Sequence, residues 1–191
     1  MNLKEYNNID KFYHRFCSIC TIPSNVKLQI IHDRDILKFG DYEFEVIETP
    51  GHSPGHTSFY ENNNKLLISG DVIGDEGTIW YSPSSGGAVA YLNSIDRIKN
   101  FNIKMVFPSH GDKFTNYNER LDEIQKEINQ KDIDVMKVIK NGPCKFFELA
   151  EKLFDLKTYR IFPGTIILES HLDKLELENK IRREDDFILL C

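Results

Sequence analysis

The stretch TPGHSPGH, from Thr49 to His56, places two histidines four residues apart in a run of prolines and glycines. It directly follows YEFEVIE, residues 42–48, in which apolar and charged residues alternate as they do along a half-buried β-strand. Imidazoles are common metal ligands, but a turn can also hold histidines for structural reasons. The stretch therefore predicts a strand that ends in a tight loop, and the rest of the chain decides whether that loop binds a metal.

Two further segments end in the same way, with an apolar run that leads into small residues and a metal-binding residue type. They are LLISGD, which ends at Asp71, and MVFPSHGD, which contains His110. Strand ends at one edge of a sheet bring such side chains together, and a neighbouring glycine lets the backbone approach closely. Two neutral imidazoles and a carboxylate suit Zn²⁺, and a carboxylate can bridge two cations. His52, Asp71 and His110 are therefore candidate ligands for one or two zinc ions.

Each candidate ligand also has a structural alternative. His52 could be a turn histidine satisfied by backbone groups, Asp71 a turn carboxylate at a strand end, and His110 a cap of the loop that follows. The recurrence of three such motifs in one chain favours the metal site.

Composition narrows the class of protein. The chain has 191 residues and a formal net charge of −6, so nucleic-acid binding is left open but is not favoured by the charge. The N-terminal MNLKEYNNIDKFY has no apolar signal region, and no window approaches the ~20 apolar residues of a membrane span. Without an export signal, the four cysteines are better interpreted as reduced thiols than as disulfides. We therefore expect a cytoplasmic protein with no membrane segment.

The first part of the chain is predicted to be mainly β-structure. DILKFGDYEFEVIET predicts a hairpin that turns at Gly40-Asp41, because apolar and charged residues alternate beside a turn-forming pair. TSFYENNNKLLISGD predicts a second hairpin with its turn at residues 61–64. A helix is expected to begin near residues 84–87, followed by the strand IKMVF. The residues of this helix expected to face inward are Val89, Leu92, Ile95 and Ile98.

From residue 118 onward the apolar period is helical, and a change of architecture is predicted near Gln130. KFFELAEKLF and GTIILESHLDKLELENK predict two further helices, and KIRREDDFILL predicts a hairpin with an acidic turn. Three helices followed by a hairpin are the parts of a winged helix. We therefore predict two domains, residues 1–130 and residues 131–191.

The motifs TPGHSPGH, LLISGDVI and VFPSHGD, in this order, resemble the later metal motifs of the metallo-β-lactamase superfamily. The resemblance implies that His52 ligates one metal, Asp71 bridges two metals and His110 ligates the second. It also implies that His56 supports the loop rather than the metal. ELAEKLF with ESHLDKLELENKI resembles the small winged-helix domain found on a subgroup of these hydrolases. The expected fold is therefore α+β: a partial αββα sandwich, mainly its second half, followed by a winged-helix domain.

The first metal motif of that family, H-x-H-x-D-H, is absent from the sequence, and so is the opening sheet. Three donors cannot saturate two cations, so we expect a truncated hydrolase that is weak or inactive as an isolated chain. A sandwich also needs two facing sheets, and one apolar sheet face would be left open here. We expect a homodimer or a missing N-terminal half to cover that face.

The resemblance implies a metal-dependent hydrolase in which metal-bound hydroxide attacks an ester, thioester or phosphodiester. Its substrate would be a small molecule or a phosphodiester. The alternative is a non-catalytic, degenerate relative that acts through its winged helix as a protein or nucleic-acid binding module.

The remaining potential donors are better explained as structural. His14, Cys17 and Cys20 form H-x-x-C-x-x-C, but no second pair of ligands stands nearby, so free thiols are favoured. His171 lies on an apolar helical stripe and is expected to be a packed or partly exposed helix residue. The basic residues of KIRR are followed at once by three acidic residues, which favours a solvated turn over a phosphate contact.

Overall fold

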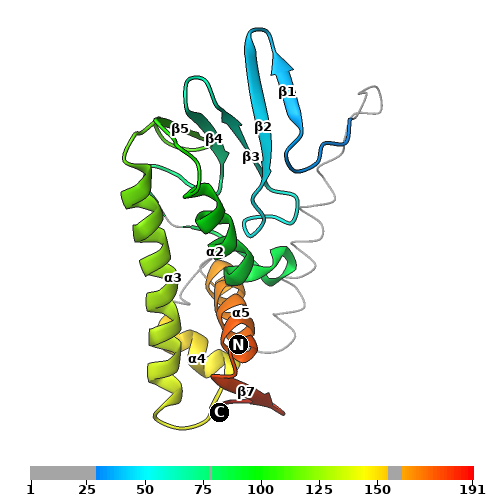
Figure 1. The fold of residues 1–191 in the computed structure, drawn as a ribbon. Helices are drawn as coiled ribbons and strands as arrows, with labels where there is room; N and C mark the ends of the chain where they lie inside the picture. The colour runs from blue at the N-terminus through cyan, green and yellow to red at the C-terminus, as the bar shows by residue number, and fades with distance from the viewer. Residues whose placement is uncertain (1–28, 78, 155–160) are drawn as a thin grey trace. The chain divides into compact units, whose positions relative to one another are not determined.

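The computed structural model describes residues 29–77, 79–154 and 161–191, drawn in colour in Figure 1. Nearly all of them belong to one compact unit, His32–Cys191. The H-x-x-C-x-x-C group of His14, Cys17 and Cys20 lies outside the described residues. The unit His32–Cys191 holds the three predicted metal motifs.

A five-stranded sheet forms the first part of this unit (Figure 1). The two predicted hairpins are confirmed, and Gly40 takes the left-handed conformation, with a φ of 60°, that the first turn requires. Strands β2 and β4 both run antiparallel to β3, and β5 runs parallel to β4, so β2, β4 and β5 end at one edge. The strands lie in chain order: β1 (Ile36–Phe39), β2 (Tyr42–Glu48), β3 (Thr57–Glu61), β4 (Leu66–Gly70) and β5 (Met105–Pro108).

Helices α2 (Gly87–Ile98) and α3 (Tyr117–Ile139) share a hydrophobic core with one face of the sheet, and the short 3₁₀ helix η1 (Pro83–Ser85) precedes α2. The predicted inward face of α2 is correct for Ile95 and Ile98, and Leu92 is half-buried and packs against the same core, whereas Val89 is only half-buried. Tyr91 is also buried, and its hydroxyl donates a hydrogen bond to the Val72 carbonyl at 2.5 Å. The buried face of α2 therefore keeps the three-and-four spacing of an amphipathic helix and adds a polar anchor to it.

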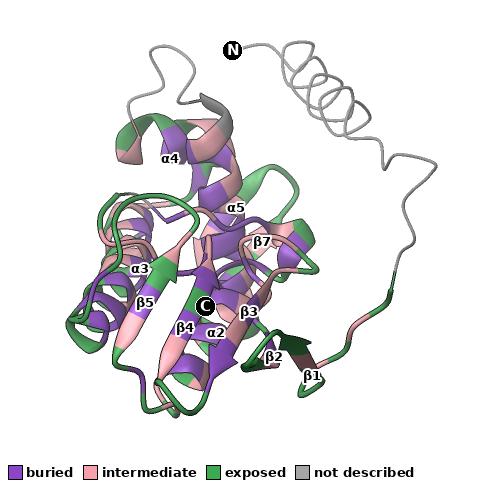
Figure 2. Cartoon of the chain, turned by 90° about the horizontal axis from the view of Figure 1, so that it is seen from above, coloured by how far each residue is buried: buried purple, intermediate pink, exposed green. Residues whose placement is uncertain are grey.

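The opposite face of the sheet carries exposed apolar side chains. Ile68 and Phe107 are paired across β4 and β5 and are 40% and 38% exposed, while Tyr42 on β2 is 49% exposed. Strand β1 at the edge is also mostly exposed (Figure 2). An exposed apolar face is what half of a sandwich would present. The homodimer or N-terminal half that we expect to cover it stays a prediction.

A second hydrophobic cluster fills the C-terminal part of the unit. Helix α3 contributes residues up to Ile128 to the first cluster and residues from Val135 to the second, so it runs unbroken through the predicted boundary at 130. The boundary between residues 1–130 and 131–191 stays a prediction. The other elements are β6 (Cys144–Lys145), α4 (Phe146–Leu153), α5 (Ile161–Leu177), β7 (Ile181–Glu184) and β8 (Phe187–Leu190), with the strands in the order β6-β8-β7.

The structure confirms the α+β class, with a sheet, helices and a small second sheet. None of the helices within the described ranges has the length and apolar character that a membrane crossing needs.

Candidate metal centre

Three of the predicted site residues meet at the edge where β2, β4 and β5 end. Asp71 directly follows β4, His110 lies two residues beyond β5, and His52 lies in the loop after β2. The His52 Nε2 atom is 3.6 Å from the Asp71 Oδ2 atom, and the His110 Nε2 atom is 3.4 Å from the Asp71 Oδ1 atom. Each imidazole therefore faces a different oxygen of the same carboxylate.

These separations suit donors that share a cation better than donors that bond to each other. Two ligands about 2.1 Å from a tetrahedral zinc ion lie about 3.4 Å apart, whereas a direct hydrogen bond would be shorter than 3.2 Å. Within the described parts of the chain, however, no group of three or more His, Cys, Asp or Glu side chains could hold a metal ion. The arrangement is two pairs of donors that share Asp71, and neither pair is a closed metal site.

The imidazole of His52 fits a ligand-binding role. Its Nδ1 atom is buried and has no hydrogen-bond partner among the residues that the structure describes, while its side chain is 28% exposed. Leaving a buried nitrogen without a partner costs free energy, and no hydrogen bond of Nδ1 holds the His52 ring in place. The Gly51 that precedes it has a φ of 130°, and a Cβ there would lie 2.7 Å from the Tyr91 backbone. Close packing of this loop on α2 therefore sets the position of His52.

His110 stands on a fixed loop but is itself open to solvent. The Ser109 N–H donates to the Gly70 carbonyl at 3.0 Å and extends the β4–β5 ladder. The Asp75 carboxylate accepts the Asp112 N–H at 3.1 Å and closes the loop. The His110 side chain is 91% exposed, so its backbone is held while its imidazole is free to reorient toward a ligand.

His56 contacts the backbone of Asp71 rather than its carboxylate. The Asp71 N–H donates to His56 Nε2 at 2.9 Å, so the ring proton sits on Nδ1 and donates to Thr49 Oγ1 at 2.8 Å. Thr49 can then donate to Ser58 Oγ at 3.0 Å, and Ser58 donates to the Ser69 carbonyl at 3.1 Å. Burial, and then the neighbouring His52, lower the pKa of His56, which keeps the ring neutral in this role.

Gly70 is predicted to be essential for this contact. A Cβ at Gly70 would lie 2.6 Å from His56 Nε2, and its φ of 61° also disfavours a side chain. We expect Gly70→Ala to lower the free energy of unfolding by about 2–4 kcal/mol. Gly40→Ala is the matched control, because Gly40 has nearly the same φ of 60° but nothing within 4 Å of the added Cβ. Urea unfolding of both variants measures the difference, and equal losses would contradict the role of the His56 contact.

The three residues border a cavity of about 210 Å³ whose other walls were not predicted from the sequence. Arg120 of α3 lies in this wall and donates from Nε to the Gly74 carbonyl at 3.1 Å and from a terminal nitrogen to the Gly77 carbonyl at 2.8 Å. The signal in the sequence that could have identified Arg120 was its position on the buried stripe of α3, four residues before Ile124. The remaining lining residues are Gly70, Gly74, Glu76, Gly77, Ile79, Trp80, Tyr91 and Pro108.

Known proteins resemble this chain over the same region. The model of the family described as "Metallo-beta-lactamase superfamily" matches residues 21–110, which include His52, Asp71 and His110. A beta-lactamase-like protein 2 homolog from Drosophila melanogaster is 27% identical, over 84% of this chain and 55% of its own length. The acyl-coenzyme A thioesterase MBLAC2 of Gallus gallus is 29% identical, over 52% of this chain and 35% of its own length.

Solved structures also resemble most of the chain. A beta-lactamase domain protein from Burkholderia ambifaria superposes with a TM-score of 0.81 at 21% identity, over 90% of this chain and 54% of that protein. At this identity the superposition shows a shared fold. The chain thus spans between about a third and about half of the length of these three proteins.

Proposed function

We propose that this chain, whose residues 21–110 match the model of the metallo-β-lactamase superfamily, carries part of the site of a metal-dependent hydrolase. The observation that supports this most directly is the placement of two imidazoles opposite the two oxygens of Asp71. His52 and His110 would each ligate one divalent ion, zinc in our proposal, and Asp71 would bridge the two ions. A divalent ion bound there would supply a water activated for attack at neutral pH.

The chain's own residues would position the metal ions and offset part of their positive charge. His52 and His110 must be neutral imidazoles to ligate a cation, and the negative charge of Asp71 would offset part of the cation's charge. His56 holds the Asp71 backbone by accepting its N–H, so the carboxylate is directed from the end of β4 toward both histidines. Because these donors form two incomplete pairs, we expect the chain alone to bind metal weakly and to hydrolyse substrate slowly.

The substrate we favour is a small acyl thioester. The relative from Gallus gallus is named an acyl-coenzyme A thioesterase, and the cavity lining includes the apolar or aromatic residues Ile79, Trp80 and Tyr91. Such a wall suits an acyl chain or another apolar group. An ester or a phosphodiester needs the same activated water, so the donor set alone does not choose among these bonds.

Residues 131–191 form, in our proposal, a winged-helix-like domain. The support is the order of helices and strands, with the β7–β8 hairpin closing a three-stranded sheet. The basic residues of the β7–β8 hairpin and of the turn before it do not favour nucleic-acid binding, because they are already paired with carboxylates. Arg183 contacts Glu169, Asp173 and Glu176, Arg182 contacts Glu184, and Lys180 contacts Glu178. The non-catalytic binding module is therefore not favoured.

Thioester hydrolysis tests the proposed function. Purified chain supplemented with Zn²⁺ is expected to release free thiol from an acyl-coenzyme A faster than Zn²⁺ alone, although slowly. Asp71→Asn keeps the shape but removes the charge, and we expect it to lower the rate by about 100-fold or to background. Asp186→Asn is the control, because Asp186 is an exposed turn residue with an 84% exposed side chain. Equal rates for the wild type and Asp71→Asn would contradict the proposal.

A further inference from the structure

The cavity that the candidate ligands border is also lined by part of a short segment, Ile79 to Ser82, that we call the Trp80 segment. Ile79 and Trp80 line the cavity. Tyr81, between Trp80 and Ser82, is fully buried and does not line the cavity, and its ring centre lies 5.5 Å from that of Tyr91. The segment therefore has one surface in the cavity and one in the protein interior.

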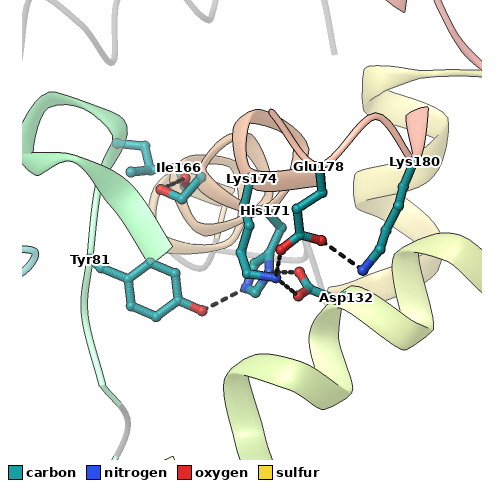
Figure 3. Close-up of polar contacts among 8 residues, drawn as sticks. Tyr81, Asp132, Ile166, His171, Lys174, Glu178 and Lys180 are labelled. Carbon is teal, nitrogen blue, oxygen red and sulfur yellow. Dashed lines mark hydrogen bonds and ion pairs between the residues drawn. The ribbon is translucent and has the colours of Figure 1, made fainter. Parts of the chain in front are cut away.

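A chain of buried polar groups leads from Tyr81 to the C-terminal helices (Figure 3). The Tyr81 hydroxyl lies 2.6 Å from His171 Nε2 on α5, and His171 Nδ1 lies 2.6 Å from Asp132 Oδ1 on α3. The other Asp132 oxygen accepts a hydrogen bond from Lys174 Nζ at 2.5 Å. Lys174 also pairs with Glu178 at 2.8 Å, at the more exposed end of the chain of contacts.

While His171 is neutral, the hydrogen bonds of this network can run in only one direction, from Tyr81 through His171 to Asp132. Burial works against the charged form of Asp132, but the hydrogen bonds from His171 and Lys174 outweigh it and lower the Asp132 pKa, so this carboxylate only accepts. His171 must then carry its proton on Nδ1 and accept at Nε2. Burial, and then the charge of Asp132, raise the pKa of Tyr81 far above its usual range, so Tyr81 stays a hydroxyl and donates.

We propose that Tyr81, His171 and Asp132 are positioning residues through which helices α3 and α5 hold the Trp80 segment against the cavity of His52, Asp71 and His110. A fully satisfied buried network fixes the geometry of the groups it joins. The residues 171 and 132 lie outside the cavity, so the C-terminal helices would shape the substrate wall without touching the substrate. The part of the inference that concerns substrate rests on the proposed function.

Trp80 makes the inference testable, because it is the only tryptophan of the chain. Tyr81→Phe removes the hydroxyl and keeps the ring. In the metal-free protein we expect this variant to raise the acrylamide quenching constant of Trp80 fluorescence by about two-fold or more, as the segment opens more often. Asp132→Asn should act in the same direction. The double variant should show no more than the larger single effect, because the residues act in series.

Tyr60→Phe is the matched control for a merely structural loss. It removes a buried hydroxyl that donates to the Asn102 carbonyl at 2.8 Å, away from the Trp80 segment. It should lower the melting temperature and leave Trp80 quenching unchanged. In addition, the ¹⁵N chemical shifts of His171 should show the proton on Nδ1 in the wild type.

Unchanged quenching in Tyr81→Phe, or an equal change in Tyr60→Phe, would overturn the proposal. If the effects of Tyr81→Phe and Asp132→Asn on quenching were additive, the inference that these residues act in series would be wrong. All of these measurements use protein without metal, so they hold whether or not the metal site proves correct. If the proposed function were wrong, the Asp71 variants would behave like the wild type, whereas Tyr81→Phe would still raise the quenching of Trp80.

Discussion

Replacing Asp71 by alanine is expected to remove nearly all binding of divalent metal by the purified chain. Among the residues that the structure describes, Asp71 is the carboxylate that both His52 and His110 face, so its loss leaves each imidazole as an isolated donor. Mutation of residues that merely orient a ligand already costs about 10–100-fold in metal affinity, so we expect a loss of at least about 100-fold for Asp71→Ala. Equilibrium dialysis against Zn²⁺, with metal content per protomer as the readout, measures this effect.

His52→Ala and His110→Ala should each weaken binding less, because each removes a donor from only one pair. The controls are His32→Ala and Asp186→Ala, whose side chains are 75% and 84% exposed and lie outside the cavity. They should bind like the wild type. If Asp71→Ala bound as much zinc as these controls, the assignment of Asp71 would be wrong.

Asp132→Asn is expected to have the largest effect on stability. The Asp132 carboxylate is 10% exposed and holds both Lys174 and His171, so its neutralisation leaves the Lys174 ammonium group with only Glu178 as a charged partner. Breaking one side of a buried ion pair costs about 3 kcal/mol or more, which corresponds to a fall in melting temperature of roughly 10 °C. Asp134→Asn on the same helix is the control, because Asp134 accepts only an exposed hydrogen bond from Gln130.

The cost of Asp132→Asn should depend on pH in a defined direction. The pKa of Asp132 is lower in the folded protein than its value of about 3.9 in the unfolded chain. A lowered folded pKa stabilises the protein at pH values above the unfolded pKa, and this stabilisation is lost as the pH falls through the folded pKa. Urea unfolding of the wild type and the variant should therefore differ most near neutral pH and converge below about pH 4. A constant difference across this range would contradict the charged role of Asp132.

The strands could be predicted because they depend on local sequence. A turn pair at Gly40-Asp41 between alternating residues defines a hairpin, and this hairpin formed as predicted. Asp71 and His110 each follow a strand, and parallel pairing of β4 with β5 places those strand ends side by side. This pairing is a contact between distant residues, so the meeting of the site residues was inferred from the recurrence of the motifs and their family resemblance.

The polar anchors could not be predicted in the same way, because they join residues far apart in the chain. Tyr81 and His171 are 90 positions apart, and Asp132 comes from a third element. The hydrogen bond from Tyr91 on α2 to the Val72 carbonyl likewise joins residues of different elements. A signal did exist for Asp132 and Arg120, which occupy buried positions on the otherwise apolar inner stripe of α3. Charged residues at such positions require partners, but the sequence does not say which ones.

Anomalous X-ray scattering at the zinc absorption edge, from crystals grown with Zn²⁺, would locate a metal ion bound by Asp71. We predict at least one zinc ion at about 2.0–2.2 Å from an Asp71 carboxylate oxygen and from the Nε2 atom of His52 or His110. His56 should keep its hydrogen bond to the Asp71 N–H and should not contact the metal. Zinc bound only elsewhere on the chain, with no anomalous peak between Asp71 and either imidazole, would contradict the account.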